Sequence, residues 1–315
     1  MEDAQRGKLA RILPGLADHA DLQGGHPLSH EPDRAAGAFR AASGKEVWAV
    51  DLKERFGAKF GVWALSENVI VDGDKVICMP GGGKALVAAL DKNSGKTIWT
   101  TTGLDDPAAY CSPVLVNHNG VRQLITMTSR TVIGVDVGNG KLLWSYPYRM
   151  RFSQHATTPV YHEGHVFVAC GHSTGGTLLR IATDSKSVEK VWFLREFDNC
   201  HGGVVLLDGR LYGSGCRLGG KGFFCVEFLS GKMTHADRSV LKVGIAYADG
   251  MLYCLEHTRR MHLVEIVPEG TKIVSHFDLP GKKKTNAYLA HPVICGGRLY
   301  LRHADNLYVH DVRAN

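Results

Sequence analysis

The sequence Ala89-Leu90-Asp91-Lys92-Asn93-Ser94-Gly95-Lys96-Thr97-Ile98-Trp99 has the pattern of a β-hairpin. Apolar residues lead into a Ser-Gly turn of the kind that tolerates positive φ, and β-branched and aromatic residues follow it. The sequence Gly138-Asn139-Gly140-Lys141-Leu142-Leu143-Trp144 repeats this pattern. Each copy therefore predicts a strand, a tight turn and a second strand that ends on tryptophan.

A second kind of turn recurs along the chain, with a glycine followed by an apolar run. Its spacings are 47, 44, 45, 41 and 47 residues, and its members are Gly73, Gly120, Gly164, Gly209, Gly250 and Gly297. A short apolar segment precedes each turn, and a second and a third apolar segment follow it. Four strands in a repeat of this length indicate the blade of a β-propeller.

We therefore expect an all-β fold of four-stranded antiparallel blades, with six repeat units visible. The first strands of the units are expected at 68–71, 113–116, 159–161, 204–207, 244–247 and 292–295. The third strands are expected at 85–90, 131–135, 177–181, 223–228, 261–266 and 307–310.

Four tryptophans end successive units: Trp48, Trp99, Trp144 and Trp192, at spacings of 51, 45 and 48 residues. A buried aromatic ring removes on the order of 150–250 Å² from water. A ring at this position can wedge between neighbouring blades. We expect these tryptophans to be structural.

The set Ala89, Asp91, Gly95 and Trp99 forms the pattern A-x-D-x-x-x-G-x-x-x-W, which resembles the tryptophan-docking motif of quinoprotein (PQQ-binding-like) β-propeller repeats. The next copy keeps Asp136, Gly140 and Trp144, with Gly134 at the alanine position; the earlier copy keeps Ala38, Gly44 and Trp48, with Arg40 at the aspartate position. The resemblance covers roughly residues 41–315. It implies a propeller related to WD40-like folds, and such proteins commonly have about eight blades.

The resemblance leads to two hypotheses of function, because the family holds both dehydrogenases and a non-catalytic outer-membrane assembly lipoprotein. The dehydrogenases bind PQQ with calcium, and they have adjacent cysteines and a catalytic aspartate. This chain has no adjacent cysteines, and no segment matches the calcium ligands or the aspartate residue by residue. The first hypothesis is a non-catalytic scaffold that binds a protein or a small molecule at a propeller face. The alternative is a PQQ- and calcium-dependent alcohol or sugar dehydrogenase, whose catalytic and cofactor-binding residues stay unassigned.

Three histidines precede first strands of blades and are candidate metal ligands: His155, His201 and His291. They do not share one register, and among 16 histidines the simpler interpretation is ordinary loop hydrogen bonds. The segment Gly81-Gly82-Gly83-Lys84 lacks the spacing of a phosphate loop and is expected to be a turn. Loop residues Arg149, Arg151, Arg259, Arg260 and Lys282-Lys283-Lys284 have no interleaved aromatics, so no nucleic-acid partner is expected.

Composition and the chain ends complete the sequence-based expectations. A net charge of +6 is modest for 315 residues, no apolar run is long enough to span a membrane, and no CxxC motif is present. We expect a monomer, cytoplasmic as written because no signal peptide is visible, with buried reduced thiols at Cys78, Cys170, Cys216 and Cys254. Many relatives are exported, and a missing N-terminal portion would hide a signal.

Residues 1–40 are expected to be a poorly packed or disordered tail, and residues 41–315 the propeller. Residues 45–50 resemble a fourth strand without the three before it, and the last unit, 291–312, lacks a clear fourth strand. Two interpretations stay open: six blades in which this strand closes the ring, or an eight-bladed family member that lacks two N-terminal blades.

Overall fold

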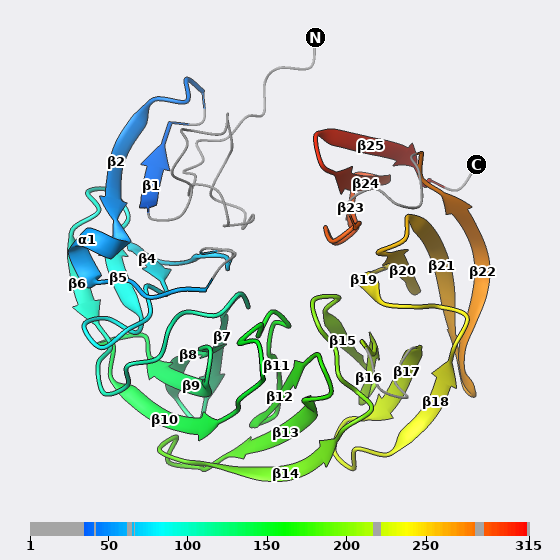
Figure 1. Ribbon diagram of the computed structural model, residues 1–315, viewed down its shortest axis with the longest axis horizontal. Helices are drawn as coiled ribbons and strands as arrows, with labels where there is room; N and C mark the ends of the chain where they lie inside the picture. Colours follow the sequence, from blue (N-terminus) through cyan, green and yellow to red (C-terminus); the bar gives the residue numbers. More distant parts are fainter. Residues whose placement is uncertain are drawn as a thin grey trace. The chain divides into compact units, whose positions relative to one another are not determined.

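The computed structural model describes residues 35–40, 42–61, 65, 67–216, 222–280 and 287–313. These residues form β-strands almost throughout, with one short helix, α1 (Leu52–Phe56) (Figure 1). Asp51 caps the helix by accepting hydrogen bonds from the N–H groups of Lys53 and Glu54, and Gly57 ends it in the left-handed conformation. No helix in the described part of the chain is long and apolar enough to cross a membrane.

The strands form seven antiparallel sheets, each made of strands that are consecutive in the chain. The first three sheets are β1 (Ala35–Phe39) and β2 (Glu46–Asp51); β3 (Ile70–Asp72), β4 (Lys75–Cys78), β5 (Ala88–Asp91) and β6 (Thr97–Thr100); β7 (Val114–His118), β8 (Val121–Met127), β9 (Thr131–Asp136) and β10 (Leu142–Pro147).

The next two sheets are β11 (Val160–His162), β12 (His165–Cys170), β13 (Gly175–Ile181) and β14 (Val188–Leu194); β15 (Val204–Leu207), β16 (Arg210–Ser214), β17 (Phe223–Glu227) and β18 (Met233–Asp237). The last two are β19 (Val243–Ala248), β20 (Met251–Glu256), β21 (Arg260–Val267) and β22 (Gly270–Asp278); β23 (Val293–Cys295), β24 (Arg298–His303) and β25 (Asn306–Asp311).

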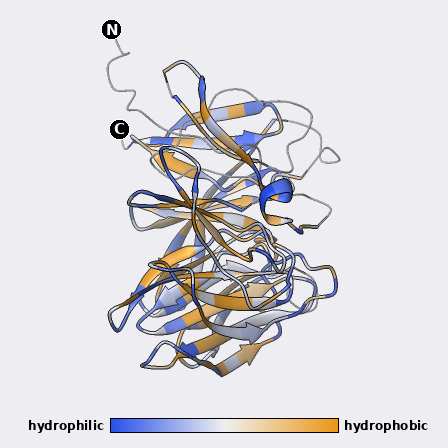
Figure 2. Cartoon of the chain, turned by 90° about the vertical axis from the view of Figure 1, so that its left-hand side faces the viewer, coloured by the Kyte–Doolittle hydropathy of each residue, from blue (hydrophilic) through white to orange (hydrophobic). Residues whose placement is uncertain are grey.

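This architecture confirms the predicted all-β propeller of four-stranded antiparallel blades. Each of the six turn glycines lies between the first and second strands of a sheet, as in the register Val204↔Gly213 to Leu207↔Arg210. The expected first and third strands match the observed ones within a few residues. Hydrophobic residues concentrate in the strands, whereas α1 and many turns are hydrophilic (Figure 2).

The chain divides into two compact units, residues 1–165 with 180–189, and residues 166–179 with 190–315. In the first unit, Trp48, Val76 and Leu90 share one buried cluster, and Trp99, Leu124 and Ile133 share another. In the second unit, the cluster around Tyr212 and Leu252 lies between the β15–β18 and β19–β22 sheets. Each cluster mixes residues of two successive sheets, so a blade buries its apolar faces against its neighbours.

Three of the four tryptophans lie against a turn glycine of the next blade and donate their indole N–H to a main-chain carbonyl there. The donor–acceptor distances are 2.9 Å for Trp48 to Lys92, 3.1 Å for Trp99 to Val137 and 2.8 Å for Trp192 to Phe228. The glycines in contact are Gly95, Gly140 and Gly231, all with positive φ. The ring of Trp192 thus packs against Gly231, although the blade β15–β18 that contains Gly231 has no tryptophan of its own.

The aspartates of the motif shape the turns that receive these rings. The Asp91 carboxylate accepts hydrogen bonds from the N–H groups of Asn93 and Ser94, and the Asp136 carboxylate accepts one from the N–H of Gly138 at 2.7 Å. The hydroxyl of Ser94 also donates to Asp91 and is the main reason that the pKa of this carboxyl is lowered. These are Asx turns, in which a short acidic side chain bonds main-chain N–H groups just ahead of it.

The side chain of Trp144 packs differently from that of Trp99. The cross-strand partner of Trp144 is Gly134, whereas the partner of Trp99 is the fully buried Ala89. A Cβ at residue 134 would lie 2.2 Å from Cε2 of Trp144, so the ring lies flat on this glycine. Its Nε1 donates to Oε1 of Gln123 at 2.8 Å, within its own blade. Where the motif has Gly134 in place of alanine, the ring of Trp144 therefore packs within its own blade.

The N-terminal part differs from the sequence-based expectation in one respect. Residues 35–39, inside the segment expected to be a tail, form β1, which pairs with β2 from Ala35↔Asp51 to Phe39↔Glu46. The sequence does not indicate this strand, because Ala-Ala-Gly-Ala has little β-propensity. Among the described strands β2 pairs with β1, and β23–β25 form a three-stranded sheet. Residues 1–34 lie outside the described residues.

Candidate functional site

His155 belongs to the first unit and makes interior contacts. It is fully buried between β10 and β11, and its Nε2 donates to the carbonyl of Tyr148 at 2.7 Å. The Tyr148 ring packs edge-on against it, with 5.8 Å between centroids. Burial lowers the pKa of this histidine, which keeps it neutral at pH 7.

His201 and His291 lie together in the second unit, on the loops that lead into β15 and β23. His291 Nε2 donates to the carbonyl of His201 at 3.0 Å. Gly203 makes room for this contact, because a Cβ there would lie 2.6 Å from Cε1 of His291. The structure thus brings two of the three predicted histidines together.

Lys242 and His257 complete this loop cluster, and the N–H of His257 donates to the carbonyl of Lys242 at 3.2 Å. Burial, followed by the positive charges of Lys242, His291 and His257, lowers the pKa of His201 to about 4. Burial and Lys242 also lower the pKa of His257. The cluster is therefore a cationic patch that disfavours further protonation.

Two buried polar side chains hold the loop before β15 in place. Asp198 accepts the N–H of Cys216 at 2.6 Å and the N–H of Ser173 at 2.9 Å. Asn199 donates to the carbonyls of Gly203 and Ser214, at 3.1 and 2.9 Å. Both side chains are fully buried, so the loop is fastened to the ends of neighbouring strands.

Cys200 and Cys216 lie beside this cluster. Each thiol has the largest influence on the pKa of the other, and the charge of Lys242 acts to lower both pKa values. Sequence reasoning placed Cys216 among buried core thiols and did not single out Cys200. The signal was present, because the two cysteines stand nine residues before and seven residues after Gly209. A hairpin centred on that turn carries both cysteines to one end.

The donor atoms of this region do not suit calcium. Its ring nitrogens, thiols and lysine ammonium are soft or cationic groups, whereas calcium takes carboxylate and carbonyl oxygens. Within the described ranges, no three His, Cys, Asp or Glu side chains are grouped as metal ligands would be. The described residues of the cluster therefore do not fit PQQ bound with calcium.

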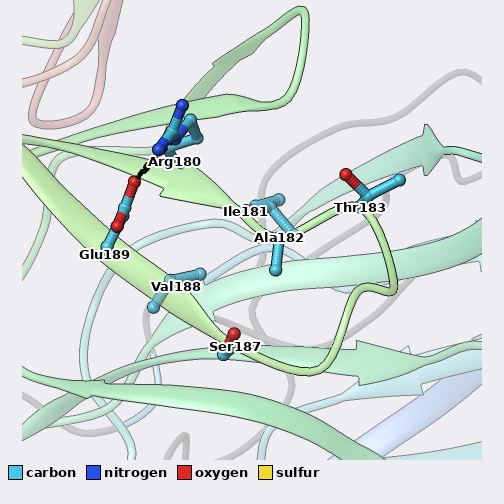
Figure 3. Close-up of a pocket in the computed structure, with 7 residues that line it drawn as sticks. All are labelled: Arg180, Ile181, Ala182, Thr183, Ser187, Val188 and Glu189. Atoms are coloured by element: carbon cyan, nitrogen blue, oxygen red, sulfur yellow. Dashed lines mark hydrogen bonds and ion pairs between the residues drawn. The ribbon is translucent and has the colours of Figure 1, made fainter.

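A shallow pocket lies at the β13–β14 hairpin, lined by Arg180, Ile181, Ala182, Thr183, Ser187, Val188 and Glu189 (Figure 3). Arg180 Nε donates to Glu189 Oε1 at 2.7 Å, and the figure shows the two side chains directed at one another. Because the two charges of the pocket neutralise each other, its lining offers a ligand little beyond a solvated ion pair.

The other predicted loop features are structural where they are described. Gly81-Gly82-Gly83-Lys84 connects β4 and β5, which confirms the expected turn. Arg259 and Arg260 both pair with Asp278, at 3.1 and 2.8 Å. The segment 282–284 lies outside the described residues.

The four-stranded repeats and the glycine-docked tryptophans define a PQQ-type β-propeller protein. The family model described as outer membrane protein assembly factor BamB matches residues 14–232, and the chain belongs to this family. None of the curated proteins compared matches the sequence.

Solved structures of three proteins share the fold at low identity. BamB from Moraxella catarrhalis is 15% identical, with a TM-score of 0.64 over 88% of this chain and 78% of that chain. The computationally designed Ika8 protein is 12% identical, with a TM-score of 0.60 over 89% and 78%. A europium-containing methanol dehydrogenase is 12% identical, with a TM-score of 0.57 over 88% and 69%. The similarity extends to an assembly factor, a designed protein and an enzyme, so it shows the fold alone.

Proposed function

We propose that this protein is a non-catalytic propeller scaffold that binds an extended segment of a partner protein along its β23–β25 sheet. The observation that carries the proposal is a cross-strand row of exposed side chains on one face of this sheet. Val293 pairs with Tyr300, and Tyr300 pairs with Val309, so the three side chains lie side by side.

The exposure of this sheet is one-sided. Val293 is 55% exposed, Val309 49% and Leu307 62%. On the opposite face Leu299 and Leu301 are buried in the cluster shared with β20 and β21. A contiguous apolar face that a blade would normally bury is typical of an interaction surface.

The edge of the same sheet supports strand addition. In every sheet from β3 to β22 the third strand pairs with a fourth, whereas β25 pairs only with β24 among the described strands. Such an edge presents main-chain N–H and C=O groups that can hydrogen-bond to an added strand.

The charges of this face indicate the chemistry of the partner. Arg298 and Arg302 flank Tyr300 two residues away on either side, so they lie on the same face of β24. Asp311, opposite Arg298, is paired with Arg313. Because neighbouring residues of an added strand point to opposite faces, this face suits a segment whose every second residue is apolar or acidic.

A fluorescein-labelled peptide that carries valine and glutamate in turn at every second position, with threonine between them, tests the proposal by fluorescence anisotropy with the full chain. We expect saturable binding, weakened at least tenfold by Val309→Lys. The matched control is Val274→Lys on β22, an exposed valine on the outer strand of a complete sheet. Absence of saturable binding, or equal loss in both variants, contradicts the proposal.

The alternative, a quinoprotein-like oxidoreductase, is supported by fold likeness alone and is tested on the same sample. Titration with PQQ, with and without calcium, is followed by tryptophan fluorescence. Saturable, calcium-dependent quenching would replace the scaffold proposal with the dehydrogenase hypothesis. If the protein binds the peptide and PQQ causes no quenching, the scaffold proposal is supported.

A further inference from the structure

Two thiols lie together where the β15–β16 hairpin meets its flanking loops. Val204 pairs with Gly213, so the residues that enter β15 run beside those that leave β16. Cys200 precedes β15 and Cys216 follows β16, and each thiol has the largest influence on the pKa of the other. Within the described ranges both cysteines are free thiols.

The backbone around the two thiols is held on both sides. Asp198 accepts the N–H of Cys216, and Asn199, next to Cys200, bonds the carbonyls of Gly203 and Ser214. Gly171 closes the third side, because a Cβ there would lie 2.8 Å from Cβ and 2.9 Å from Sγ of Cys200. The two backbone segments that carry Cys200 and Cys216 are therefore held next to one another by buried hydrogen bonds.

The pKa values of the two thiols are shifted in opposite directions. The S–H of Cys200 is the main cause that lowers the pKa of Cys216 to about 6. The charge of Lys242 and the main-chain N–H of His172 act in the same direction, while burial and Asp198 oppose them. The pKa of Cys200 is raised, first by its hydrogen bond to Cys216 and then by burial. A thiolate beside a protonated thiol is the pairing that thiol–disulfide exchange uses.

Cys216 is itself buried and Cys200 is partly buried, so the lowered pKa of Cys216, and not its burial, distinguishes it from the buried cysteines elsewhere. Cys78, Cys111 and Cys254 are almost completely buried, and burial raises the pKa of each thiol, to about 12 for Cys78 and about 11 for Cys111. Cys170 is also buried. Cys295 on β23 is exposed. It therefore provides a surface thiol for comparison.

We propose that Cys200 and Cys216 form a reversible dithiol–disulfide pair that exchanges with low-molecular-weight disulfides such as oxidised glutathione. The Cys216 thiolate attacks one sulfur of the reagent, whose S–S bond breaks and releases one glutathione thiolate. Cys200 then gives its proton to that thiolate and attacks the Cys216 sulfur of the mixed disulfide. The second glutathione leaves as a thiolate and takes up the proton that Cys216 had lost to solvent. The two cysteines are oxidised, and the reagent is reduced to two thiols.

Incubation of the full chain with oxidised glutathione, followed by alkylation and peptide mass spectrometry, tests the proposal. We expect a single Cys200–Cys216 link and loss of alkylation at both sites, reversed by excess reduced glutathione. In Cys200→Ser, a stable glutathione adduct should remain on Cys216. In Cys216→Ser, no internal link should form. Cys295→Ser is the matched control and should leave the link unchanged.

A second readout separates the thiolate from general accessibility. In Cys295→Ser and in Cys200→Ser/Cys216→Ser, alkylation of each thiol is followed against pH by mass spectrometry, with folding checked by circular dichroism. The first variant keeps Cys200 and Cys216, and the alkylation rate of Cys216 should rise well below the ordinary thiol pKa of 9.0. The second keeps Cys295 as the surface thiol for comparison.

Two results would overturn the proposal. One is that both Cys200 and Cys216 of the folded parent stay fully alkylatable at equilibrium with oxidised glutathione. The other is that the internal link maps to a different pair of cysteines.

Discussion

The ring of Trp99 on β6 lies against Gly140 in the β9–β10 turn of the next blade. Its Nε1 donates to the carbonyl of Val137 at 3.1 Å, and the hydroxyl of Thr101 donates to the carbonyl of Gly140 at 2.8 Å. A Cβ at residue 140 would lie 2.5 Å from Cε3 of Trp99, and φ is +77°. Glycine is therefore required here for two separate reasons, its conformation and its lack of a side chain.

Gly140→Ala should destabilise the protein more than Gly120→Ala. Gly120 has a similar φ of +82° but nothing within 4 Å of its added Cβ. The control should cost about 1–2 kcal/mol for left-handed strain, and Gly140→Ala about 1–3 kcal/mol more for overpacking against the ring. Urea unfolding of both variants measures the difference. Equal unfolding midpoints would show that the ring does not constrain residue 140.

Trp144→Phe should cost about 1–3 kcal/mol in the free energy of unfolding beyond the lost ring area. The substitution removes the indole N–H that donates to Oε1 of Gln123. The side chain of Gln123 is fully buried, so this oxygen is left without that donor. Adding Gln123→Leu should recover part of this cost, because it removes the unpaired acceptor. A double-mutant cycle measures the coupling between the two residues. Strict additivity of the two single changes would contradict the hydrogen bond.

His201 should make the protein less stable as the pH falls from 6.5 to about 4. Its pKa falls from an ordinary value of 6.5 to about 4 in the folded state, so the unfolded chain binds the proton first. The contribution of His201 to the free energy of unfolding is constant above pH 6.5 and is lost between pH 6.5 and about 4. It amounts to roughly 3 kcal/mol.

The test of this pH dependence compares His201→Gln with the parent chain. His155 and His257 have pKa values shifted in the same direction, so both proteins retain their share of the acid sensitivity. Thermal midpoints measured at several pH values should fall less steeply in His201→Gln. Parallel curves for the two proteins would refute the assignment to His201.

Asp198→Ala should cost at least about 2 kcal/mol, because the N–H groups of Cys216 and Ser173 lose their acceptor inside the protein. The control is Asp184→Ala, whose exposed carboxylate accepts one N–H, from Lys186 at 3.0 Å. That change should stay within about 0.5 kcal/mol. Chemical denaturation of both variants gives the comparison, and similar losses would mean that Asp198 does not hold its loop.

The repeat itself could be predicted because its signals are local. The turn at Gly209 needs positive φ, and the apolar segments on either side of it must pair in a hairpin, so turn and strands follow from neighbouring residues alone. The strand β1 could not be predicted, because four of its five residues, Ala35 to Ala38, are alanine or glycine. Its strand character depends on pairing with β2 rather than on propensity.

The candidate site was predicted only in part, because its residues come together through contacts between distant parts of the chain. His201 and His291 were singled out by their positions before first strands, but their contact joins residues 90 positions apart. Cys200 and Cys216 meet because Asp198 and Asn199 fasten a loop to the end of β16.

The sequence by itself determined the propeller, its blade period and the glycines that receive the tryptophans, since these depend on backbone conformation and on hydrophobic pattern within one repeat. Only the tertiary structure decided which way Trp144 turns, which thiols meet and which sheet face stays open. Those features depend on contacts between segments far apart in the chain, whose geometry is set by how blades pack and not by any residue's own preference.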